Sequence, residues 1–229
     1  MTENWTPVTN VEEGLALEAG LFSETGQGVH LWQSAKPALV CPRTYRKRDG
    51  FKAAVENSAE RGWPVFMRPS GGGTVPLGPG VLNMVVALTV PQSFGILNGY
   101  QMLCEPIIRL GDELGLHLEP GATPDSYCDG DWNLSLEGRK IVGTAQRLRP
   151  LRQGRVRLLG HALILVDCDV EPGAMAVDAF HKDLGLDPIR ADVHMTLRDA
   201  ANGSLPDLSE IAGVLQREAL MSIQKRFES

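Results

Sequence analysis

The sequence predicts an α+β fold with a mixed, largely antiparallel sheet packed with helices. Strand patterns outnumber helix patterns in the first two thirds of the 229 residues. They follow one another directly instead of alternating with crossover helices, which is typical of α+β rather than α/β proteins. The 43% hydrophobic and 22% charged residues indicate a folded globular protein. We expect one domain over residues 1–229, with a helical extension at 170–229 as the part that the patterns define least.

A helix pattern opens the chain and short strand patterns follow it. Residues 11–24 set apolar side chains among acidic and small residues, as in an amphipathic helix. Two β-type runs at 29–32 and 38–41 predict a hairpin, because Lys36-Pro37 between them disfavours a continuous helix. The elements that follow are a helix over 49–61, a strand over 65–67, a strand over 81–90 and a helix over 98–116.

The second half begins with a loop rich in Gly, Pro and Asp over 120–131. Strand patterns at 132–136 and 140–146 flank Glu137-Gly138 and predict a β-hairpin, and a further strand covers 155–166. The C-terminal third is expected to contain segments at 178–184 and 186–191, a short helix capped by Thr196 or Asp199, and a closing helix over 208–227.

Composition and charge exclude several classes of function. The formal charge of −6 argues against a nucleic-acid-binding protein, because phosphate contacts require a basic face. The longest apolar stretch, around 81–90, is too short to span a bilayer, and no basic segment leads into an apolar run at the N-terminus. We therefore expect a cytoplasmic protein that binds neither nucleic acid nor membrane.

One basic stretch interrupts this acidic chain. Residues 139–157 contain seven Lys or Arg residues and no Asp or Glu. Two interpretations are open, a solvated strand and turn or a docking face for an acidic protein partner or an anionic cofactor.

The cysteines and histidines lack the spacing of a disulfide framework or a metal site. The four cysteines lie far apart with no CxxC pair, which suits free thiols in a reducing compartment. Cys41, Cys104 and Cys168 have apolar neighbours and are interpreted as small core residues. No metal site is predicted, because the histidines show no metal-ligand spacing.

A glycine-rich segment follows the strand expected at 65–67. It reads Arg68-Pro69-Ser70-Gly71-Gly72-Gly73-Thr74-Val75. Three consecutive glycines let the backbone approach a bound group and present N–H donors to phosphate, carboxylate or carbonyl oxygen. The segment matches neither the P-loop nor GxGxxG, and taken alone it is equally typical of a flexible turn.

The hairpin at 132–146 contains the second candidate segment, in which Lys140 opens a strand beside Arg139. A lone lysine on a strand is usually a solvated surface charge. The small residues Gly143, Thr144 and Ala145 leave room for a ligand beside this lysine, which favours a functional role.

The RPSGGGTV loop and the later GRKIVGTAQR hairpin together resemble the lipoate-protein ligase and octanoyltransferase superfamily, which shares a catalytic domain with biotin protein ligase. The resemblance runs from about residue 12 to residue 166. It implies a mixed-sheet domain with the acyl chain in a tunnel beside the glycine loop. It also implies that the ammonium of Lys140 holds the acyl carbonyl or carboxyl oxygen and stabilises negative charge there.

The candidate substrate-binding residues come from both segments. The positions that match the family are Arg68, Gly71, Gly72, Gly73 and Gly143. Their neighbours Ser70, Thr144 and Ala145 complete the set. His161 begins an apolar strand and is a candidate acid-base or orienting group, with a structural histidine as the alternative.

The stretch SYCDGDWNLSLEGRKIVGTAQR looks closest to the amidotransferase type, which moves octanoyl groups from the glycine-cleavage H protein to other lipoyl domains. On this match Cys128 is the nucleophile and carries the acyl group as a thioester. Two positions depart from the pattern of the ligases. Trp132-Asn133 stands where ligases show an Asn-Asp pair, which disfavours a magnesium-ATP site, and Pro76-Leu77 stands where a histidine often follows the glycine loop.

Three hypotheses follow from these motifs. The leading one is an octanoyl or lipoyl protein acyltransferase with a Cys128 thioester, which requires no cofactor. The second is an ATP-dependent lipoate-protein ligase, which requires ATP and magnesium, and the third is a non-catalytic acyl- or carrier-binding module. The expected partners are lipoyl-domain proteins, namely the H protein and the E2 subunits of 2-oxoacid dehydrogenases, or acyl carrier protein. The arginines of 147–157 would steer such an acidic partner.

Overall fold

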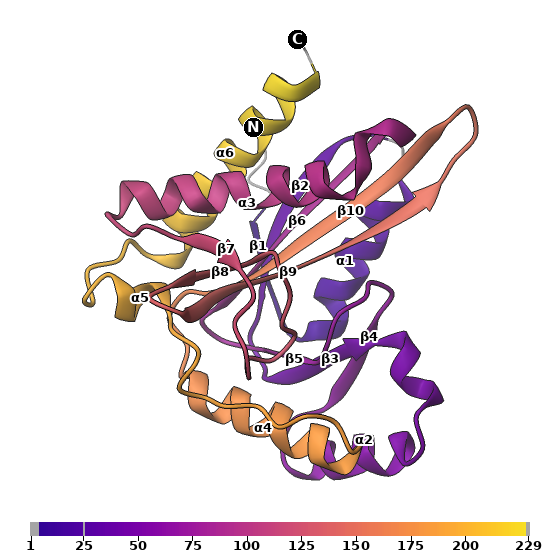
Figure 1. Ribbon diagram of the computed structural model, residues 1–229, viewed down its shortest axis with the longest axis vertical. Helices are drawn as coiled ribbons and strands as arrows, with labels where there is room; N and C mark the ends of the chain where they lie inside the picture. The colour runs from indigo at the N-terminus through magenta and orange to yellow at the C-terminus, as the bar shows by residue number, and fades with distance from the viewer. Residues whose placement is uncertain (1–4, 25, 228–229) are drawn as a thin grey trace.

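A seven-stranded sheet runs through the centre of the protein (Figure 1). The computed structural model describes residues 5–24 and 26–227. In spatial order the strands are β1 (Trp5–Val8), β2 (Gly28–Ser34), β6 (Val81–Pro91), β10 (Arg155–Leu165), β9 (Arg139–Pro150), β8 (Asn133–Leu136) and β7 (Glu119–Gly121). Only the β1–β2 pair is parallel among these described strands. The predicted α+β class with a largely antiparallel sheet is confirmed.

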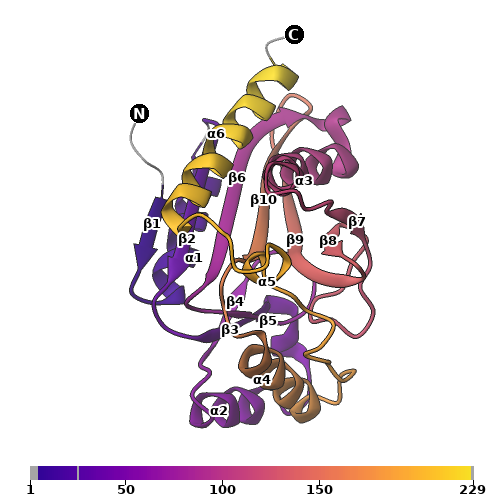
Figure 2. The same ribbon diagram turned by 90° about the vertical axis from the view of Figure 1, so that its left-hand side faces the viewer.

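A second sheet of three strands packs below the first (Figure 2). It contains β3 (Ala38–Pro42), which pairs in parallel with β4 (Val65–Arg68) and antiparallel with β5 (Val75–Leu77). The hairpin expected between 29–32 and 38–41 is therefore wrong. Both edges of β2 are occupied by β1 and β6, and a turn at Ser34, whose hydroxyl donates to the carbonyl of Lys36, directs the chain into the second sheet.

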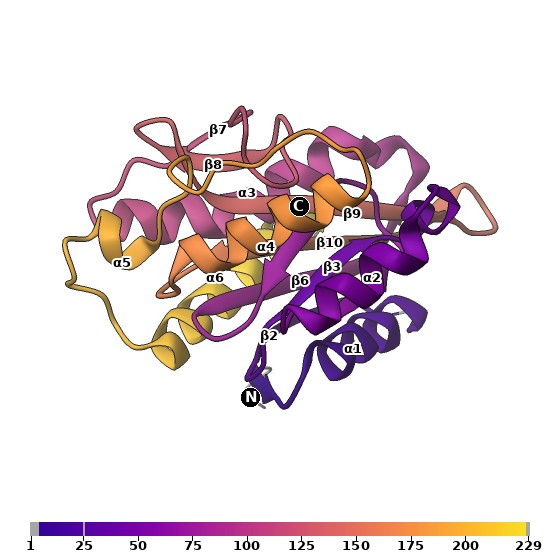
Figure 3. The same ribbon diagram turned by 90° about the horizontal axis from the view of Figure 1, so that it is seen from below.

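Helices cover both faces of the large sheet. Helices α3 (Gly95–Glu113) and α6 (Leu208–Phe227) pack together over one face, and α1 (Val11–Ser23) lies against the other. Helices α2 (Phe51–Glu60) and α4 (Val170–Asp183) lie side by side next to the small sheet (Figures 2 and 3). The helices expected at 11–24, 49–61, 98–116 and 208–227 are confirmed.

The long strand β6 contributes side chains to both halves of the core. Its side chains alternate, so that Met84 and Val86 pack under α3 and α6 while Val85 and Ala87 face α1 and the small sheet. Burial on both faces explains why β6 reads as a continuous apolar run in the sequence.

The connecting segments show local capping. Thr196 caps the short helix α5 (Leu197–Ala200), and the Asp199 carboxylate accepts a hydrogen bond from the Thr196 N–H, so both candidate residues take part. The hairpin turn at Glu137 and Gly138 has positive φ at both residues, as expected for a two-residue turn. Within residues 5–24 and 26–227, no helix has the length and apolar character needed to cross a membrane.

Candidate active site

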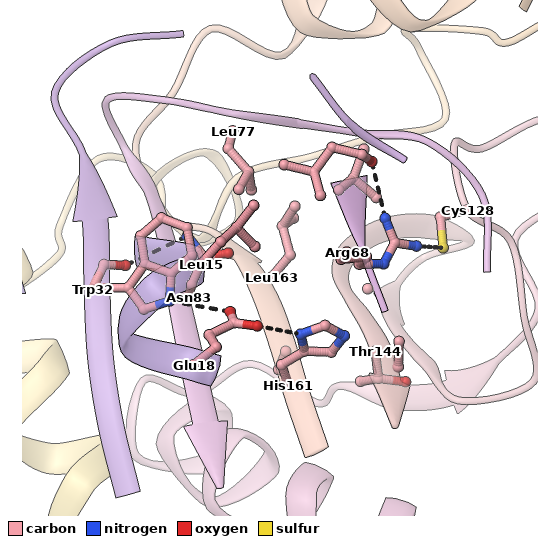
Figure 4. A pocket seen from close by; sticks show the side chains of 15 residues that line it. Leu15, Glu18, Trp32, Arg68, Leu77, Asn83, Cys128, Thr144, His161 and Leu163 are labelled. Atoms are coloured by element: carbon pink, nitrogen blue, oxygen red, sulfur yellow. Dashed lines mark hydrogen bonds and ion pairs between the residues drawn. The ribbon is translucent and has the colours of Figure 1, made fainter. Parts of the chain in front are cut away.

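A pocket opens between α1, the large sheet and the small sheet. The volume of the pocket, including the space at its open mouth, is about 460 Å³. The apolar lining is Leu15, Trp32, Val40, Val75, Leu77, Ala162 and Leu163, and the other lining residues are Glu18, Arg68, Asn83, Cys128, Gly143, Thr144, Ala145 and His161. Figure 4 places Cys128 and Arg68 at one end and Trp32 and Glu18 at the other. This shape suits an apolar chain whose reacting carbon lies at the cysteine end.

Cys128 is partly exposed and lies in the loop between β7 and β8. Its sulfur accepts a hydrogen bond from the backbone N–H of Gly73 at 3.1 Å, and a guanidinium nitrogen of Arg68 lies 3.8 Å away. The backbone φ of Cys128 is +51°, a left-handed conformation that is uncommon for residues other than glycine. Such conformations cluster at functional sites, where surrounding contacts hold them in place.

Arg68 is 4% exposed, and its guanidinium organises the glycine loop. It donates to the carbonyl oxygens of Val40, Gly71 and Gly73 at 2.9, 2.9 and 2.7 Å. Among the residues that the structure describes, it bonds to no carboxylate, so its charge is left to act on the sulfur of Cys128. A fixed cation at this distance stabilises negative charge on sulfur.

The three glycines of the loop have different roles. A Cβ at Gly72, where φ is +95°, would lie 2.7 Å from the Cys128 sulfur, and a Cβ at Gly73 would lie 3.1 Å from the Cys128 Cα. A Cβ at Gly71 would meet nothing within 4 Å. The close approach that the triple glycine predicted is thus made, at two of its three positions, by Cys128 of the same chain.

Lys140 is fully buried beneath the Cys128 loop and is absent from the pocket lining. Its ammonium donates to the carbonyl oxygens of Tyr127 and of Cys128, the second at 3.0 Å, and lies 5.2 Å from the centre of the Tyr127 ring. Burial lowers the pKa of Lys140 to about 8, with Cys128 and Asp129 opposing the shift and Arg68 adding to it. The lysine holds the loop in this structure, and its role at the acyl oxygen stays a prediction.

Small residues on β9 accommodate this lysine and line the pocket. A Cβ at Gly143 would lie 3.2 Å from Cε and 3.3 Å from Nζ of Lys140, so the glycine makes space for the lysine itself. Thr144 donates to the carbonyl of Trp132 at 2.7 Å, and Ala145 faces the pocket.

The segment around His194, which follows α4, packs against the Cys128 loop. The sequence patterns did not predict this contact. The backbone of Lys140 bonds to that of Val193 and Met195 at 2.8 and 2.9 Å. Between them, His194 is fully buried, stacks on Tyr127 with ring centroids 3.9 Å apart, and accepts from the Tyr127 N–H at 3.3 Å. His194 lies 66 residues beyond Cys128 in a stretch without a motif, so only the fold brings the two together.

A polar chain crosses the pocket wall and includes two of the predicted residues. Trp32 donates to one carboxylate oxygen of Glu18 at 3.2 Å, and the other oxygen of Glu18 lies 3.1 Å from Nδ1 of His161. On the far side of the imidazole ring, Nε2 of His161 lies 2.9 Å from the Ser70 hydroxyl. The sequence pointed to His161 and Ser70 but not to Glu18 or Trp32, because a glutamate in an amphipathic helix normally reads as a solvent-exposed residue.

The basic stretch at 139–157 is partly structural. Arg157 is fully buried and donates to the carbonyls of Leu21, Phe22 and Gly26. The guanidinium groups of Arg147 and Arg149 lie 4.9 and 4.7 Å from the ring centre of Phe22. Three of the five arginines expected to steer a partner therefore fasten the C-terminal end of α1 to the sheet.

The other cysteines fit their interpretation as packing residues. Cys41 and Cys104 are buried, and burial raises their pKa values to about 11 and about 12. Cys168 is only partly buried, and burial raises its pKa to about 12. Within the described part of the chain, no group of three or more His, Cys, Asp or Glu residues is placed to hold a metal ion.

Comparison with known proteins decides the family. Residues 10–206 match the model of the lipoyl protein ligase A/B catalytic domain. The chain belongs to this family. The resemblance drawn from the glycine loop and the hairpin is confirmed, including the octanoyl-GcvH transferase type.

Two curated relatives of this lipoyl ligase-family chain illustrate the match. An octanoyl-GcvH:protein N-octanoyltransferase of Kyrpidia tusciae is 33% identical over 95% of the chain and 80% of its own length. An uncharacterised protein of Cupriavidus necator is 38% identical over 68% of the chain and 66% of its own length, slightly under two thirds.

Solved structures share the fold at low identity. A lipoate-protein ligase A bound with ATP has a TM-score of 0.74 and 17% identity, over 96% of this chain and 83% of the ligase. A Thermoplasma acidophilum ligase studied with its E2 lipoyl domain has a TM-score of 0.69 and 16% identity. The match covers 96% of this chain and 82% of that ligase.

Proposed function

We propose that this lipoyl ligase-family enzyme transfers an octanoyl or lipoyl group to the lysine of a lipoyl domain through a thioester on Cys128. The observation that carries the proposal is the position of the thiol. It lies at one end of the apolar pocket, accepts a hydrogen bond from the Gly73 N–H and faces the guanidinium of Arg68. The names of relatives such as the Kyrpidia tusciae octanoyltransferase support acyl transfer in protein lipoylation.

The reaction has two halves that share this sulfur. In the first, the sulfur of Cys128 attacks the acyl carbon of the donor, a C–S bond forms, and the donor amine or thiol leaves with a proton. In the second, the amine of the acceptor lysine attacks the thioester, a C–N bond forms, the C–S bond breaks, and the sulfur leaves as a thiolate while the amine gives up a proton. Arg68 and the Gly73 N–H stabilise the negative sulfur in both halves.

The residues present favour this reaction over ATP-dependent ligation. Asn133, which stands where ligases carry a carboxylate, donates to Asp129 at 3.1 Å and so helps to shape the Cys128 loop. Asp129 also accepts from the N–H groups of Thr123 and Gly130 at 2.7 and 2.8 Å. One oxygen of Asp129, the residue after Cys128, is thus engaged by three donors, which supports the cysteine reaction over a magnesium-ATP site.

The proposed partners are lipoyl-domain proteins. The relatives' names point to GcvH, and the H protein, E2 lipoyl domains or acyl carrier protein would supply or accept the acyl group. The free thiols suit a reducing cytoplasm, which we propose as the location.

Intact-protein mass spectrometry tests the proposal. The protein is incubated with octanoyl-H protein in the absence of ATP, and wild type is compared with Cys128→Ala and with Cys168→Ala as the matched control. An octanoyl mass gain in wild type and Cys168→Ala, but not in Cys128→Ala, is expected. Modification of a lipoyl domain only when ATP and lipoate are added would establish the ligase instead, and binding of a lipoyl domain without turnover would establish a non-catalytic module.

A further inference from the structure

A turn next to the site carries a cluster of exposed positive charges. The 3₁₀ helix η1 (Arg43–Lys47) and the residue after it contain Arg43, Arg46, Lys47 and Arg48, all of them exposed. We call this segment the basic turn. Within the described residues none of its four cations forms an ion pair with a carboxylate, although the whole chain has a formal charge of −6.

The basic turn begins where the small sheet meets the catalytic loop. Pro42, the last residue of β3, pairs with Arg68, whose guanidinium contacts the Cys128 sulfur. The turn starts at the next residue. It is anchored by Tyr45, whose ring packs against the core and under the guanidinium of Arg48 at 5.0 Å.

Tyr45 also lies within electrostatic reach of the thiol. Burial raises the pKa of Tyr45, Arg48 opposes this shift, and Cys128 adds to it. The phenol therefore lies within electrostatic reach of both Arg48 and Cys128.

The basic stretch on the β9–β10 hairpin does not occupy such a position. Arg147, Arg149 and Arg157 are engaged with Phe22 at the C-terminal end of α1. The exposed Arg152 and Arg155 lie at the hairpin tip, which projects away from the rest of the molecule (Figure 1). Arg152 is nine residues along the chain from Gly143 in the pocket wall, or about 30 Å at the rise of a strand.

We propose that the basic turn is the docking surface for the acidic face of the carrier domain that presents the acyl-lysine. An enzyme with a net negative charge repels an acidic carrier over most of its surface. Four unpaired cations beside the pocket would both attract the carrier and orient it toward Cys128. The inference rests on the proposed function, since it concerns the partner of that same site.

Charge reversal separates docking from chemistry. The double variant Arg46→Glu/Lys47→Glu is compared with Arg152→Glu/Arg155→Glu, which makes the same change of charge at the hairpin tip. Acylation of Cys128 is measured with two donors, octanoyl-H protein and the small thioester octanoyl-N-acetylcysteamine. The basic-turn variant is expected to raise KM for octanoyl-H protein about tenfold and to leave the rate with the small thioester unchanged.

Salt and a neutral variant complete the test. Raising the salt from about 50 to about 200 mM should weaken the reaction of wild type with octanoyl-H protein and should have less effect on the basic-turn variant. Arg46→Gln/Lys47→Gln should change KM in the same direction by a smaller factor, with an unchanged Tm. An unchanged KM in the basic-turn variant, or an equal rise in the hairpin-tip variant, would overturn the docking surface. Failure of wild type to form the thioester with either donor would overturn the proposed function instead.

Discussion

The imidazole of His194 stacks on the ring of Tyr127 and accepts a hydrogen bond from its backbone N–H at 3.3 Å. Nδ1 of His194 donates to the Ala191 carbonyl at 3.3 Å, so Nε2 is the free acceptor. Lys140 donates to the carbonyl of the same Tyr127. Both polar groups of the backbone just before Cys128 are therefore held by side chains, which explains how Cys128 keeps its left-handed conformation.

This contact predicts loss of stability in mild acid. Burial, and then the charge of Lys140, lowers the pKa of His194 to about 4 from an ordinary value of 6.5. Between these two pH values the unfolded chain binds more protons than the folded one, so stability is full above about 6.5 and falls as the pH drops toward 4. The expected loss is on the order of 3 kcal/mol in the free energy of unfolding, measured by urea denaturation.

A His194→Gln variant gives the control for this prediction. Glutamine does not titrate, so the variant should lose less stability than wild type between pH 6.5 and 4. Some slope should remain, because burial also lowers the pKa values of His30 and His181. Equal slopes in variant and wild type would show that His194 is not the titrating group.

The glycine loop predicts a sharp contrast between neighbouring positions. Gly73→Ala places a Cβ against the Cys128 Cα and should slow acylation about 100-fold, because a small displacement of a reacting group has an effect of this size. Gly71→Ala meets open space and should retain the wild-type rate. Single-turnover acylation of Cys128 measures both, and equal rates in the two variants would contradict the packing described for the loop.

Replacing Lys140 with methionine tests whether the buried ammonium holds the loop. Lys140→Met removes the donors to the carbonyls of Tyr127 and Cys128, so the loop should loosen and acylation should fall about 100-fold. The free energy of unfolding should change by only about 1 kcal/mol, because relief of a buried charge offsets the lost hydrogen bonds. Alkylation of Cys128 by iodoacetamide reports the loop, and an unchanged alkylation rate would argue against this role.

Gly143→Ala should displace the ammonium of the same lysine. Its Cβ would lie 3.3 Å from the ammonium and 3.2 Å from Cε, which displaces Nζ from the two carbonyls. We expect slower acylation and a loss of about 1 kcal/mol in the free energy of unfolding from overpacking. The matched control is Gly121→Ala, since a Cβ there meets nothing within 4 Å. The prediction fails if both variants behave like wild type in acylation and denaturation.

The sequence predicted the elements whose signals are local. Apolar spacing located α1, α2, α3 and α6, Glu137-Gly138 located the hairpin turn, and Thr196 with Asp199 located a cap. The short strands β1, β5 and β7 were missed, because a few residues carry too little pattern. Of helix α4, only the C-terminal part was recognised. The hairpin predicted between β2 and β3 was wrong for a related reason. Two strand patterns that are adjacent in the sequence do not show whether other strands already pair with both edges of either strand.

The candidate site divides in the same way. The sequence by itself determined that this chain has a glycine loop, a cysteine loop and a lysine strand of one family, because each is a contiguous motif. Only the tertiary structure decided that Gly72 and Gly73 make room for Cys128, that Lys140 and His194 hold Tyr127, and that Arg157 is buried. These contacts join residues far apart in the chain, and their geometry depends on how the two sheets and the C-terminal segment pack, which no local pattern encodes.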